Sequence, residues 1–443
     1  MSFRRYPLYR DSGVEWLGQV PAGWDVRTFQ RCVFVAEGQV DPEDSAFSNL
    51  ALIAPNHIES STGRLIALES ASDQGAESGK YQCIRGDVIF SKIRPSLRKV
   101  CIAPEDCLCS ADMYPLRAHS GLSNPFLYWW MLSEYFSALV VLESQRVAMP
   151  KINRESLKQI DVAVPPLNEQ TQIAAFLDRE TAKIDALVAE QRRLMELLKE
   201  KRLAVISQAV TKGLNPDAPM KPSGIEWLGD VPAHWDVVPV AYRYSVQLGK
   251  MLDTSKITGE HLRPYLRVFD VQWGEINVEG LPEMDFDDEA RRKFTLIFGD
   301  LLVNEGGSYP GRAAIWRGEI AECYYQKALH RARPTDPNRD TTEYFFYAMY
   351  LAANIGVFTA GGNEATIEHL PAEKLRRYRF PFPPLEEQES IARTLTEETS
   401  KLDALTAETQ RAIDLLQERR SALISAAVTG QIDVRALVEA ETA

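Results

Sequence analysis

A fifteen-residue segment near the start of the chain returns almost unchanged near its middle. Residues 12–26 read SGVEWLGQVPAGWDV and residues 223–237 read SGIEWLGDVPAHWDV, so 12 of 15 positions are identical at an offset of 211. Both tryptophans and the proline recur in register. Self-similarity of this kind marks a repeated structural unit. The sequence therefore predicts two diverged copies of one unit.

A second repeated segment ends each unit. Residues 164–170 read VPPLNEQ and residues 382–388 read FPPLEEQ, at an offset of 218, and the similarity continues for over 40 residues. No helix can run through the proline pairs. The stretches that follow contain no proline, and glycine occurs only at their ends, as Gly213 and Gly430. We predict long helices over about 168–212 and about 386–429, each a rod of roughly 65 Å.

Apolar residues recur along both predicted helices with a heptad-like spacing. Two helices with the same stripe in one chain most simply pack on each other. The residues expected to form the seam between them are Ile173, Leu177, Ile184, Leu187, Leu194, Leu198 and Val205 in the first helix, and Ile391, Leu395, Leu402, Leu405, Leu416 and Leu423 in the second.

The order of the units determines the direction in which these helices can pack. The first helix leads from the first head to the second, and the second helix begins at the second head. It can bury its stripe on the first helix only by running back, so we predict an antiparallel coiled coil with a pseudo-two-fold axis. The C-terminus then lies near the first SGVEWLG segment, which makes the architecture near-cyclic. The helices would be a ruler between two equivalent sites, or alternatively a hairpin that only stiffens the molecule.

Each head reads as a mixture of strands and helices, which indicates an α/β (α+β) fold of one topology in both copies. Gly86-Asp87 and Gly299-Asp300 are a local echo between otherwise diverged segments. Buried helices are expected over residues 124–142 and 343–354. Strands are expected within residues 83–94, 99–104, 299–306, 313–318 and 323–333.

The sequence carries no recognisable catalytic motif. It holds no HExxH, Walker or triad signature, and the glycine-rich residues 306–312 lack the GK[ST] ending of a phosphate loop. The histidines do not cluster. The six cysteines form no CxxC pair and do not follow the repeat, which favours free thiols in a reducing cytosol. With no signal segment and no long apolar run, we expect a cytoplasmic protein without catalytic residues or a metal site.

The charge distribution leaves room for a nucleic-acid partner. The net charge is −12, but residues 385–443 account for −6 of it, so each head can still carry a local basic face. Arg and Lys suit phosphates and guanine edges, and Asn suits adenine. For any single residue, a solvated surface charge is the alternative, and Arg376, Arg377 and Arg379 could equally cover the head–helix junction. The candidate DNA-binding residues are Lys92, Arg94, Arg98, Lys99, Arg146, Lys151 and Arg154 in the first head, and Ser308, Tyr309, Arg312, Asn363 and Thr366 in the second.

Taken together, these segments resemble the specificity subunits of type I restriction–modification enzymes. The resemblance rests on WLGQVPAGW and WLGDVPAHW, on GDVIFSKIRPSLRKV, and on the helix starts VPPLNEQTQIAAFLD and FPPLEEQESIARTLT. It covers nearly the whole chain. PPLxEQ opening a long helix twice, each time after an α/β head, is highly specific to this family.

The resemblance implies a division of labour among several chains. Residues 1–163 and 214–381 would be target recognition domains, each reading one half of a bipartite, asymmetric site in double-stranded DNA. Residues 164–213 and 382–430 would be helices that set the spacer and dock two modification (methyltransferase) subunits, with a tail over 431–443. S-adenosylmethionine, ATP and Mg would belong to these and to restriction (translocase/nuclease) subunits, and this chain would be non-catalytic. A bivalent protein-interaction scaffold without DNA readout and a self-sufficient enzyme are the alternatives.

Overall fold

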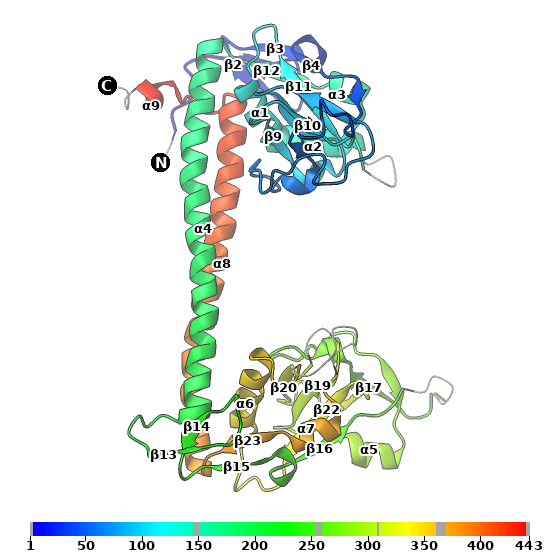
Figure 1. Cartoon of the computed structure of the whole chain (residues 1–443), viewed down its shortest axis with the longest axis vertical. Coiled ribbons are helices and arrows are strands. Elements are labelled where there is room, and N and C mark those ends of the chain that lie inside the picture. Colours follow the sequence, from blue (N-terminus) through cyan, green and yellow to red (C-terminus); the bar gives the residue numbers. More distant parts are fainter. Residues whose placement is uncertain (1–2, 145–149, 253–258, 308–309, 360–368, 440–443) are drawn as a thin grey trace. The chain divides into compact units, whose positions relative to one another are not determined.

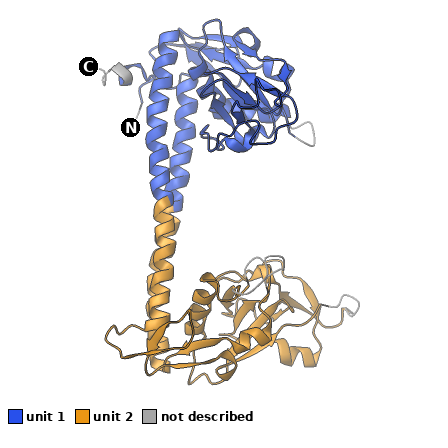
Figure 2. Cartoon of the chain, viewed as in Figure 1, with its two compact units in different colours: residues 1–192, 410–443 blue, residues 193–409 orange. Residues whose placement is uncertain are grey.

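The chain divides into two compact units, and each unit holds one head together with parts of both long helices (Figure 2). Unit 1 comprises Met1–Arg192 and Gln410–Ala443, and unit 2 comprises Arg193–Thr409. The structure is a computed structural model, and it describes residues 3–144, 150–252, 259–307, 310–359 and 369–439.

A four-stranded antiparallel sheet forms the centre of each head (Figure 1). The strand order is β4-β11-β8-β9 in unit 1 and β16-β22-β19-β20 in unit 2. The two orders correspond strand for strand, which confirms the prediction of one topology for the central sheet. The strands are β4 (Val33–Val35), β8 (Val88–Ser91), β9 (Val100–Ile102) and β11 (Met113–Ala118), and β16 (Tyr244–Leu248), β19 (Leu301–Asn304), β20 (Ala313–Ile315) and β22 (Leu329–Pro334).

A smaller sheet packs near the central sheet in each head and contains one parallel pair. In unit 1 its order is β5-β7-β10-β6, and in unit 2 it is β18-β17-β21. An apolar cluster joins the two sheets, with Ile89 in unit 1 and Leu302 in unit 2 at corresponding positions. These strands are β5 (Gln39–Val40), β6 (Leu52–Ile53), β7 (Lys80–Cys83) and β10 (Cys107–Cys109), and β17 (Leu262–Leu266), β18 (Glu283–Asp285) and β21 (Tyr324–Tyr325).

The cysteines contribute to these cores as small apolar side chains. All six are free, and all six are buried. Burial raises the pKa of the Cys101 thiol well above its usual value, so this side chain stays a neutral thiol.

The prediction of one helix over residues 124–142 is wrong in one respect, because two helices cover this stretch. Helix α1 (Asn124–Leu132) and helix α2 (Glu134–Ser144) meet at an angle of 66°. Ser133 lies between them with extended backbone, and its hydroxyl donates a hydrogen bond to the Trp130 carbonyl at 2.6 Å. Among the described residues no single helix has the length and hydropathy of a membrane span, and only this bent pair passes by length and composition. In unit 2 the corresponding helix α6 (Thr342–Asn354) is continuous, as predicted.

The long helices are α4 (Leu167–Lys212) and α8 (Leu385–Val428), each within a residue or so of its predicted limits. In unit 1 the first half of α4 lies beside the last part of α8, and in unit 2 the last half of α4 lies beside the first part of α8 (Figure 2). The two helices are therefore antiparallel, as predicted. At ~1.5 Å per residue, α4 is a continuous rod of roughly 69 Å.

Three of the leucines expected in the helix–helix seam lie outside it. Leu187, Leu194 and Leu405 are 46%, 41% and 48% exposed. From Ile184, the seam positions follow at alternating steps of four and three residues. Val188 therefore lies in the seam, and Leu187 points about 100° away from it. In the same way Met195 replaces Leu194, and Thr406 replaces Leu405. The expected leucines are the larger apolar side chains, but the alternation of four and three residues places their neighbours in the seam.

The other expected seam residues are buried or half-buried, but not all of them face only the partner helix. Ile184, Leu198, Leu402 and Leu423 are buried, and Val205 and Leu416 are half-buried. Ile173, Leu177, Ile391 and Leu395 are completely buried at the helix starts. In unit 2 the last two join the apolar core of the head, together with residues from the end of α4. The long helices thus complete the core of the head.

The ends of each head are tied together and to the long helices. Strand β3 (Asp25–Thr28) pairs with β12 (Asp161–Val164), and β15 (Asp236–Pro239) pairs with β23 (Arg379–Phe382). Beyond α8, the Asp433 amide donates to the Arg4 carbonyl at 2.8 Å, and the Tyr9 hydroxyl donates to the Gly430 carbonyl at 2.9 Å. The C-terminal end therefore lies beside the first SGVEWLG segment, as the near-cyclic prediction requires.

The remaining short elements complete this framework. Two hairpins hold the repeated WLGxVPxxW segments. Their strands are β1 (Tyr9–Asp11) and β2 (Gln19–Pro21), and β13 (Met220–Pro222) and β14 (Asp230–Pro232). The short helices are α3 (Arg154–Lys158), α5 (Asp288–Phe294), α7 (Ala372–Arg377) and α9 (Arg435–Glu439).

Candidate nucleic-acid interface

The two basic clusters predicted in the first head meet at the end of β8. The Arg94 amide donates to the Pro150 carbonyl at 3.0 Å, and the Ile152 amide donates to the Lys92 carbonyl at 3.0 Å. Ile93 and Lys151 form a β-bridge between these hydrogen bonds. The structure therefore brings Lys92, Arg94 and Lys151 together from segments that are distant in sequence.

This surface combines exposed cations with aromatic rings. Arg94 and Lys151 are exposed, and Arg94 has left-handed backbone with φ 45°. The Lys92 ammonium lies 5.3 Å from the centre of the Tyr114 ring, and the Arg154 guanidinium lies 5.0 Å from the same ring. Burial raises the pKa of Tyr114, so its hydroxyl stays neutral. Cations of this kind suit phosphates and base edges.

Three other predicted DNA-binding residues have polar partners inside the protein. Arg154 donates to the Ala36 carbonyl at 2.7 Å and to Glu37 at 3.2 Å. Lys99 donates to the Pro55 carbonyl at 2.6 Å, and Arg98 donates to Ser421 Oγ at 2.9 Å. A sequence pattern cannot separate these positioning contacts from DNA contacts, because both use the same side chains. The predicted role of these residues in binding DNA stays a prediction.

The equivalent surface of the second head has the same frame and different side chains. The Leu370 amide donates to the Glu305 carbonyl at 2.6 Å, as Ile152 does to Lys92 in the first head, so Glu305 stands where the first head has Lys92. His330 takes the place of Tyr114 and donates from Nε2 to the Leu370 carbonyl at 2.7 Å. Burial lowers the pKa of His330, so the neutral ring is favoured.

Of the six remaining predicted DNA-binding residues, the structure describes one. Arg312 is half-buried, and its guanidinium donates a hydrogen bond to Gln272 Oε1. The others lie outside the described residues, and their assignment stays a prediction. They are Arg146, Ser308, Tyr309, Asn363 and Thr366.

Two of the three arginines that could cover the head–helix junction contact backbone in the second head. Arg376 Nε donates to the Val246 carbonyl at 3.2 Å, and Arg379 Nη2 donates to the Val237 carbonyl at 2.6 Å. Arg376 thus binds β16 at Val246, much as Arg154 binds β4 at Val35 in the first head. The correspondence indicates that Arg154 contributes to holding β4 in place.

The repeated Gly-Asp turn is a structural device common to both heads. In the first head Asp87 accepts two hydrogen bonds from the Arg117 guanidinium, at 2.8 and 2.9 Å. In the second head Asp300 accepts two from Arg333, at 2.6 and 2.7 Å. Both carboxylates are buried, and the hydrogen bonds to Asp300 raise the pKa of Arg333. This bidentate pair fixes the turn that precedes β8 or β19 and hence the strand that carries the candidate residues.

The glutamine of each PPLxEQ motif holds a long helix to its head. Gln170 Nε2 donates to the carbonyls of Gly121 and Pro165, both at 2.7 Å, and its Oε1 accepts from the Ser123 amide at 2.8 Å. Gln388 does the same in unit 2, with the Pro383 carbonyl at 2.8 Å and the Thr341 amide at 3.0 Å. Both side chains are completely buried. The motif is thus explained by attachment of the helix rather than by chemistry on a substrate.

The glutamate of the same motif binds the tryptophan segment in both units, through a different side chain in each. Glu169 accepts from Trp24 Nε1 at 3.0 Å and from the Tyr6 hydroxyl. Burial and the hydrogen bond to Glu169 raise the pKa of Tyr6 far above its usual value. In unit 2, Glu387 lies 2.7 Å from His234 Nε2. Each WLGxVPxxW segment therefore docks on the first turn of the long helix that follows its own head.

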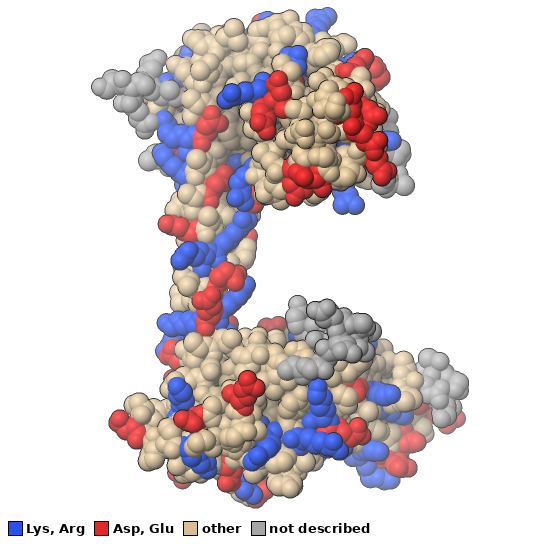
Figure 3. Space-filling model, in the orientation of Figure 1, with Lys and Arg blue, Asp and Glu red and all other residues tan. Residues whose placement is uncertain are grey.

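The surface charges are unevenly distributed, so the net charge of the chain does not identify the residues that could bind DNA. On the face shown in Figure 3, acidic side chains gather on the part of the unit 1 head that lies away from the helices. Basic and acidic side chains alternate along the long helices. Among the described residues, no group of three or more His, Cys, Asp or Glu side chains could hold a metal ion.

Comparison with known proteins identifies relatives of this architecture. Residues 58–195 and 288–415 match the family described as type I restriction modification DNA specificity domain. The EcoDI specificity subunit of Escherichia coli is 37% identical over 171 residues, which are 39% of this chain and 38% of that subunit. The putative MjaX specificity subunit of Methanocaldococcus jannaschii is 24% identical over 441 residues, covering 95% of this chain and 96% of its own length.

Solved structures share the fold. A chain from a structure that describes complex assembly and conformational transition of the type I R-M system superposes with a TM-score of 0.73 at 17% identity, and covers 92% of this chain and 98% of its own. The HsdS subunit from Thermoanaerobacter tengcongensis superposes with a TM-score of 0.53 at 17% identity, and covers 93% and 98%.

Proposed function

Because the chain belongs to the family of type I restriction modification DNA specificity domains, which matches more than half of its residues, we propose that each head reads one half of a bipartite, asymmetric DNA target. One observation carries this proposal. In both heads the residue directly after β8 or β19 accepts the same backbone hydrogen bond. The side chains at this surface differ, because Lys92 and Tyr114 in one head correspond to Glu305 and His330 in the other. A shared frame with different side chains suits the reading of two different sequences by one docking geometry.

The partners follow from the relatives. Since those are named specificity subunits of type I restriction enzymes, this chain would act with two modification subunits, with restriction subunits and with double-stranded DNA. It would contribute recognition and no catalytic residue. S-adenosylmethionine, ATP and Mg would be bound by the partner subunits.

A methylome tests this function directly. DNA from cells that express the chain with an adenine-methylating modification subunit is read by single-molecule sequencing. The expected result is methylation at a split, asymmetric motif, and no such methylation without this chain. Methyl transfer by the purified chain alone would instead support a self-sufficient enzyme. Methylation across the genome at sites that share no sequence motif would support a scaffold without DNA readout.

Lys92 is the single residue whose removal tests the interface most cleanly. Lys92→Ala in the complex with modification subunits should weaken binding of the target duplex by about 1–3 kcal/mol if the lysine reads a base. If it contacts only a phosphate, the loss should be the same for all sequences and the salt slope should fall by about 1. Fluorescence anisotropy at several salt concentrations measures both quantities.

Lys183→Ala is the matched control, because Lys183 is an exposed lysine on α4 that pairs with Glu180 at 2.8 Å. It should leave affinity and salt slope unchanged. Unchanged affinity and slope in Lys92→Ala as well, with unfolding behaviour intact, would remove Lys92 from the interface.

The long helices are proposed to set the spacer between the half-sites. Inserting seven residues into both α4 and α8 keeps the heptad in phase and lengthens the pair by about 10 Å. At ~3.4 Å per base pair, the recognised gap should grow by about three base pairs with both half-sites unchanged. The methylome of cells expressing the lengthened chain measures the gap. Altered half-site sequences would contradict the ruler, and insertion into α4 alone should abolish recognition.

A further inference from the structure

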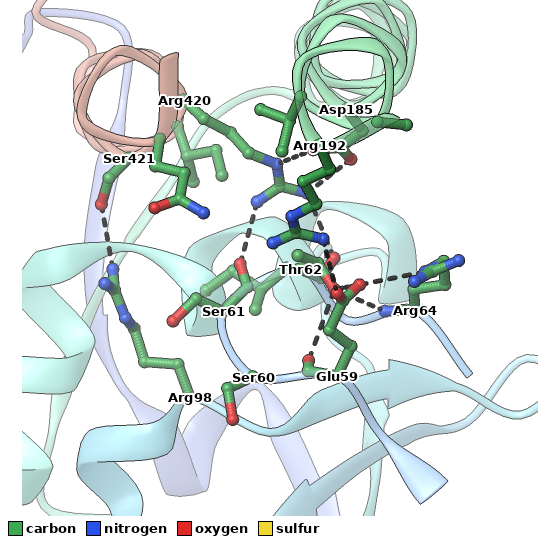
Figure 4. Close-up of a pocket in the computed structure, with 15 residues that line it drawn as sticks. Glu59, Ser60, Ser61, Thr62, Arg64, Arg98, Asp185, Arg192, Arg420 and Ser421 are labelled. Atoms are coloured by element: carbon green, nitrogen blue, oxygen red, sulfur yellow. Dashed lines mark hydrogen bonds and ion pairs between the residues drawn. The ribbon is translucent and has the colours of Figure 1, made fainter. Parts of the chain in front are cut away.

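A cavity of about 430 Å³ lies in unit 1, where a loop of the head faces both long helices (Figure 4). The head contributes residues 59–62, Arg64 and Arg98. Helix α4 contributes Asp185 and Arg192, and α8 contributes Arg420 and Ser421. The volume falls within the range of small-molecule sites, ~300–1,000 Å³.

The charged lining of this cavity carries a surplus of two positive charges. Four arginines line it, Arg64, Arg98, Arg192 and Arg420, against two carboxylates. Arg420 is paired with Asp185 at 2.9 Å, and Arg64 is paired with Glu59 at 3.0 Å.

The two remaining arginines supply the surplus. The Arg98 guanidinium donates to the Ser421 hydroxyl at 2.9 Å, and this hydroxyl donates in turn to Glu134 Oε1 at 2.8 Å, a carboxylate outside the lining of the cavity. Arg192 lies 3.6 Å from Glu59, whose carboxylate Arg64 already binds more closely. The hydrogen bond from Arg64 holds the pKa of Glu59 below its usual value, so this carboxylate is ionised near neutral pH. It is one of the two negative charges already included in the charge of the lining. In Figure 4 the side chains of Arg98 and Arg192 both extend into the space between the head and the helices.

The repeat shows that this surplus is not needed to pack the helices. At the offset of 218, the Arg420–Asp185 pair has a counterpart in the Arg202–Asp403 pair of unit 2. Arg192, however, corresponds to Gln410. Ser421 corresponds to Leu203, which packs against the core of unit 2. The Arg420–Asp185 pair therefore belongs to the repeated framework, whereas Arg192 and Ser421 are additions specific to unit 1.

We propose that this cavity binds a phosphomonoester, a small molecule that carries a terminal phosphate. Guanidinium groups match phosphate oxygens with two parallel hydrogen bonds, and Arg98 and Arg192 approach the cavity from the head and from α4. Ser60 adds a hydroxyl group to the lining, whereas the Ser421 hydroxyl already donates its proton to Glu134. A phosphomonoester carries about −1.5 to −2 charges near neutral pH, which balances the surplus, whereas a phosphodiester of the DNA backbone carries only one.

Such a ligand would contact the head loop, α4 and α8 of unit 1 at the same time. Binding to the folded unit alone stabilises it by mass action. The proposal does not depend on DNA recognition, and its test uses no target DNA.

Thermal unfolding of the full chain tests the site with four probes at constant ionic strength: inorganic phosphate, glycerol 3-phosphate, dimethyl phosphate and chloride. The two dianions should raise the unfolding temperature in a saturable way, and dimethyl phosphate and chloride should not. Hydrogen exchange should show the added protection in peptides of residues 59–64 and of α8 near Arg420.

Two variants and a neighbouring control locate the effect. Arg192→Gln and Arg98→Gln should each raise the apparent dissociation constant of glycerol 3-phosphate at least tenfold. Arg192 is 55% exposed, so its replacement leaves the fold intact even if Arg98→Gln destabilises it. Arg193→Gln, at the adjacent exposed position outside the cavity, should bind like the unaltered chain. Equal stabilisation by dimethyl phosphate, equal binding in Arg192→Gln, or no saturable effect of either dianion would each overturn the proposal.

Discussion

Replacing Gly430 by alanine is expected to lower the free energy of unfolding of unit 1 by about 2–5 kcal/mol. Gly430 ends α8 with φ +73°, a backbone conformation that costs an L-residue ~1–2 kcal/mol. A Cβ at this position would lie 2.5 Å from Pro21 Cγ and 3.2 Å from the Trp24 ring. The proline ring is part of a hairpin strand and cannot swing aside, so overpacking adds ~1–3 kcal/mol.

Gly213 supplies the matched control because it ends α4 with the same φ of +73° in unit 2. Its added Cβ would meet the Glu387 carboxylate at 3.0 Å and the Trp235 ring at 3.1 Å, so the neighbours have less far to move. Gly213→Ala should therefore cost less than Gly430→Ala. Hydrogen exchange resolved by peptide measures each unit separately, which matters because a two-unit chain does not unfold in one step. Equal losses in the two variants would refute the role assigned to Pro21.

Replacing Asp300 by alanine should destabilise unit 2 by about 3 kcal/mol. Removing one partner of a buried ion pair typically costs ~3–5 kcal/mol, because the other partner loses its compensation. The Asp300 side chain is fully buried, but that of Arg333 is 32% exposed, so water partly compensates the arginine and the loss falls at the low end. The Ile297 amide also loses its acceptor, at 2.8 Å.

A double-mutant cycle separates the pair from the turn. Arg333→Met and the double variant, measured by the same hydrogen exchange, give the coupling between the two side chains. If Asp300 acts mainly through Arg333, the double variant should be little worse than Asp300→Ala alone. Additive losses would show that the turn hydrogen bond to Ile297, rather than the ion pair, carries the effect. Peptides of unit 1 should be unaffected.

The sequence predicts the long helices accurately because a few residues force their limits. The proline pairs before α4 and α8 exclude helix, and Gly213 and Gly430 adopt the positive φ that ends one. The antiparallel direction follows from the order of the segments. The echo of Gly86-Asp87 in Gly299-Asp300 also marks a true structural equivalence, although the arginine partners could not be assigned from sequence.

The errors arise where tertiary packing decides between neighbouring residues. Leu187 is more apolar than Val188, but only the phase of the partner helix selects Val188 for the seam. The break at Ser133 is invisible in an apolar stretch, because serine fits a helix until its hydroxyl binds the preceding turn. Arg98 and Lys99 belong to one basic run in the sequence, yet their partners, Ser421 and Pro55, are remote in the chain. Composition cannot tell such contacts from a surface that binds DNA.

The division of the long helices between the units has a consequence for synthesis of the chain on the ribosome. Everything in unit 2 lies within one continuous stretch, from Arg193 to Thr409. Unit 1 begins the chain but also contains Gln410 onward, where Arg420 binds the carbonyls of Ser61 and Thr62. Domains usually complete their folding in the order of translation, N-terminal first. Here unit 1 is expected to be completed last, because its part of α8 is made last, whereas all of unit 2 has been made by Thr409.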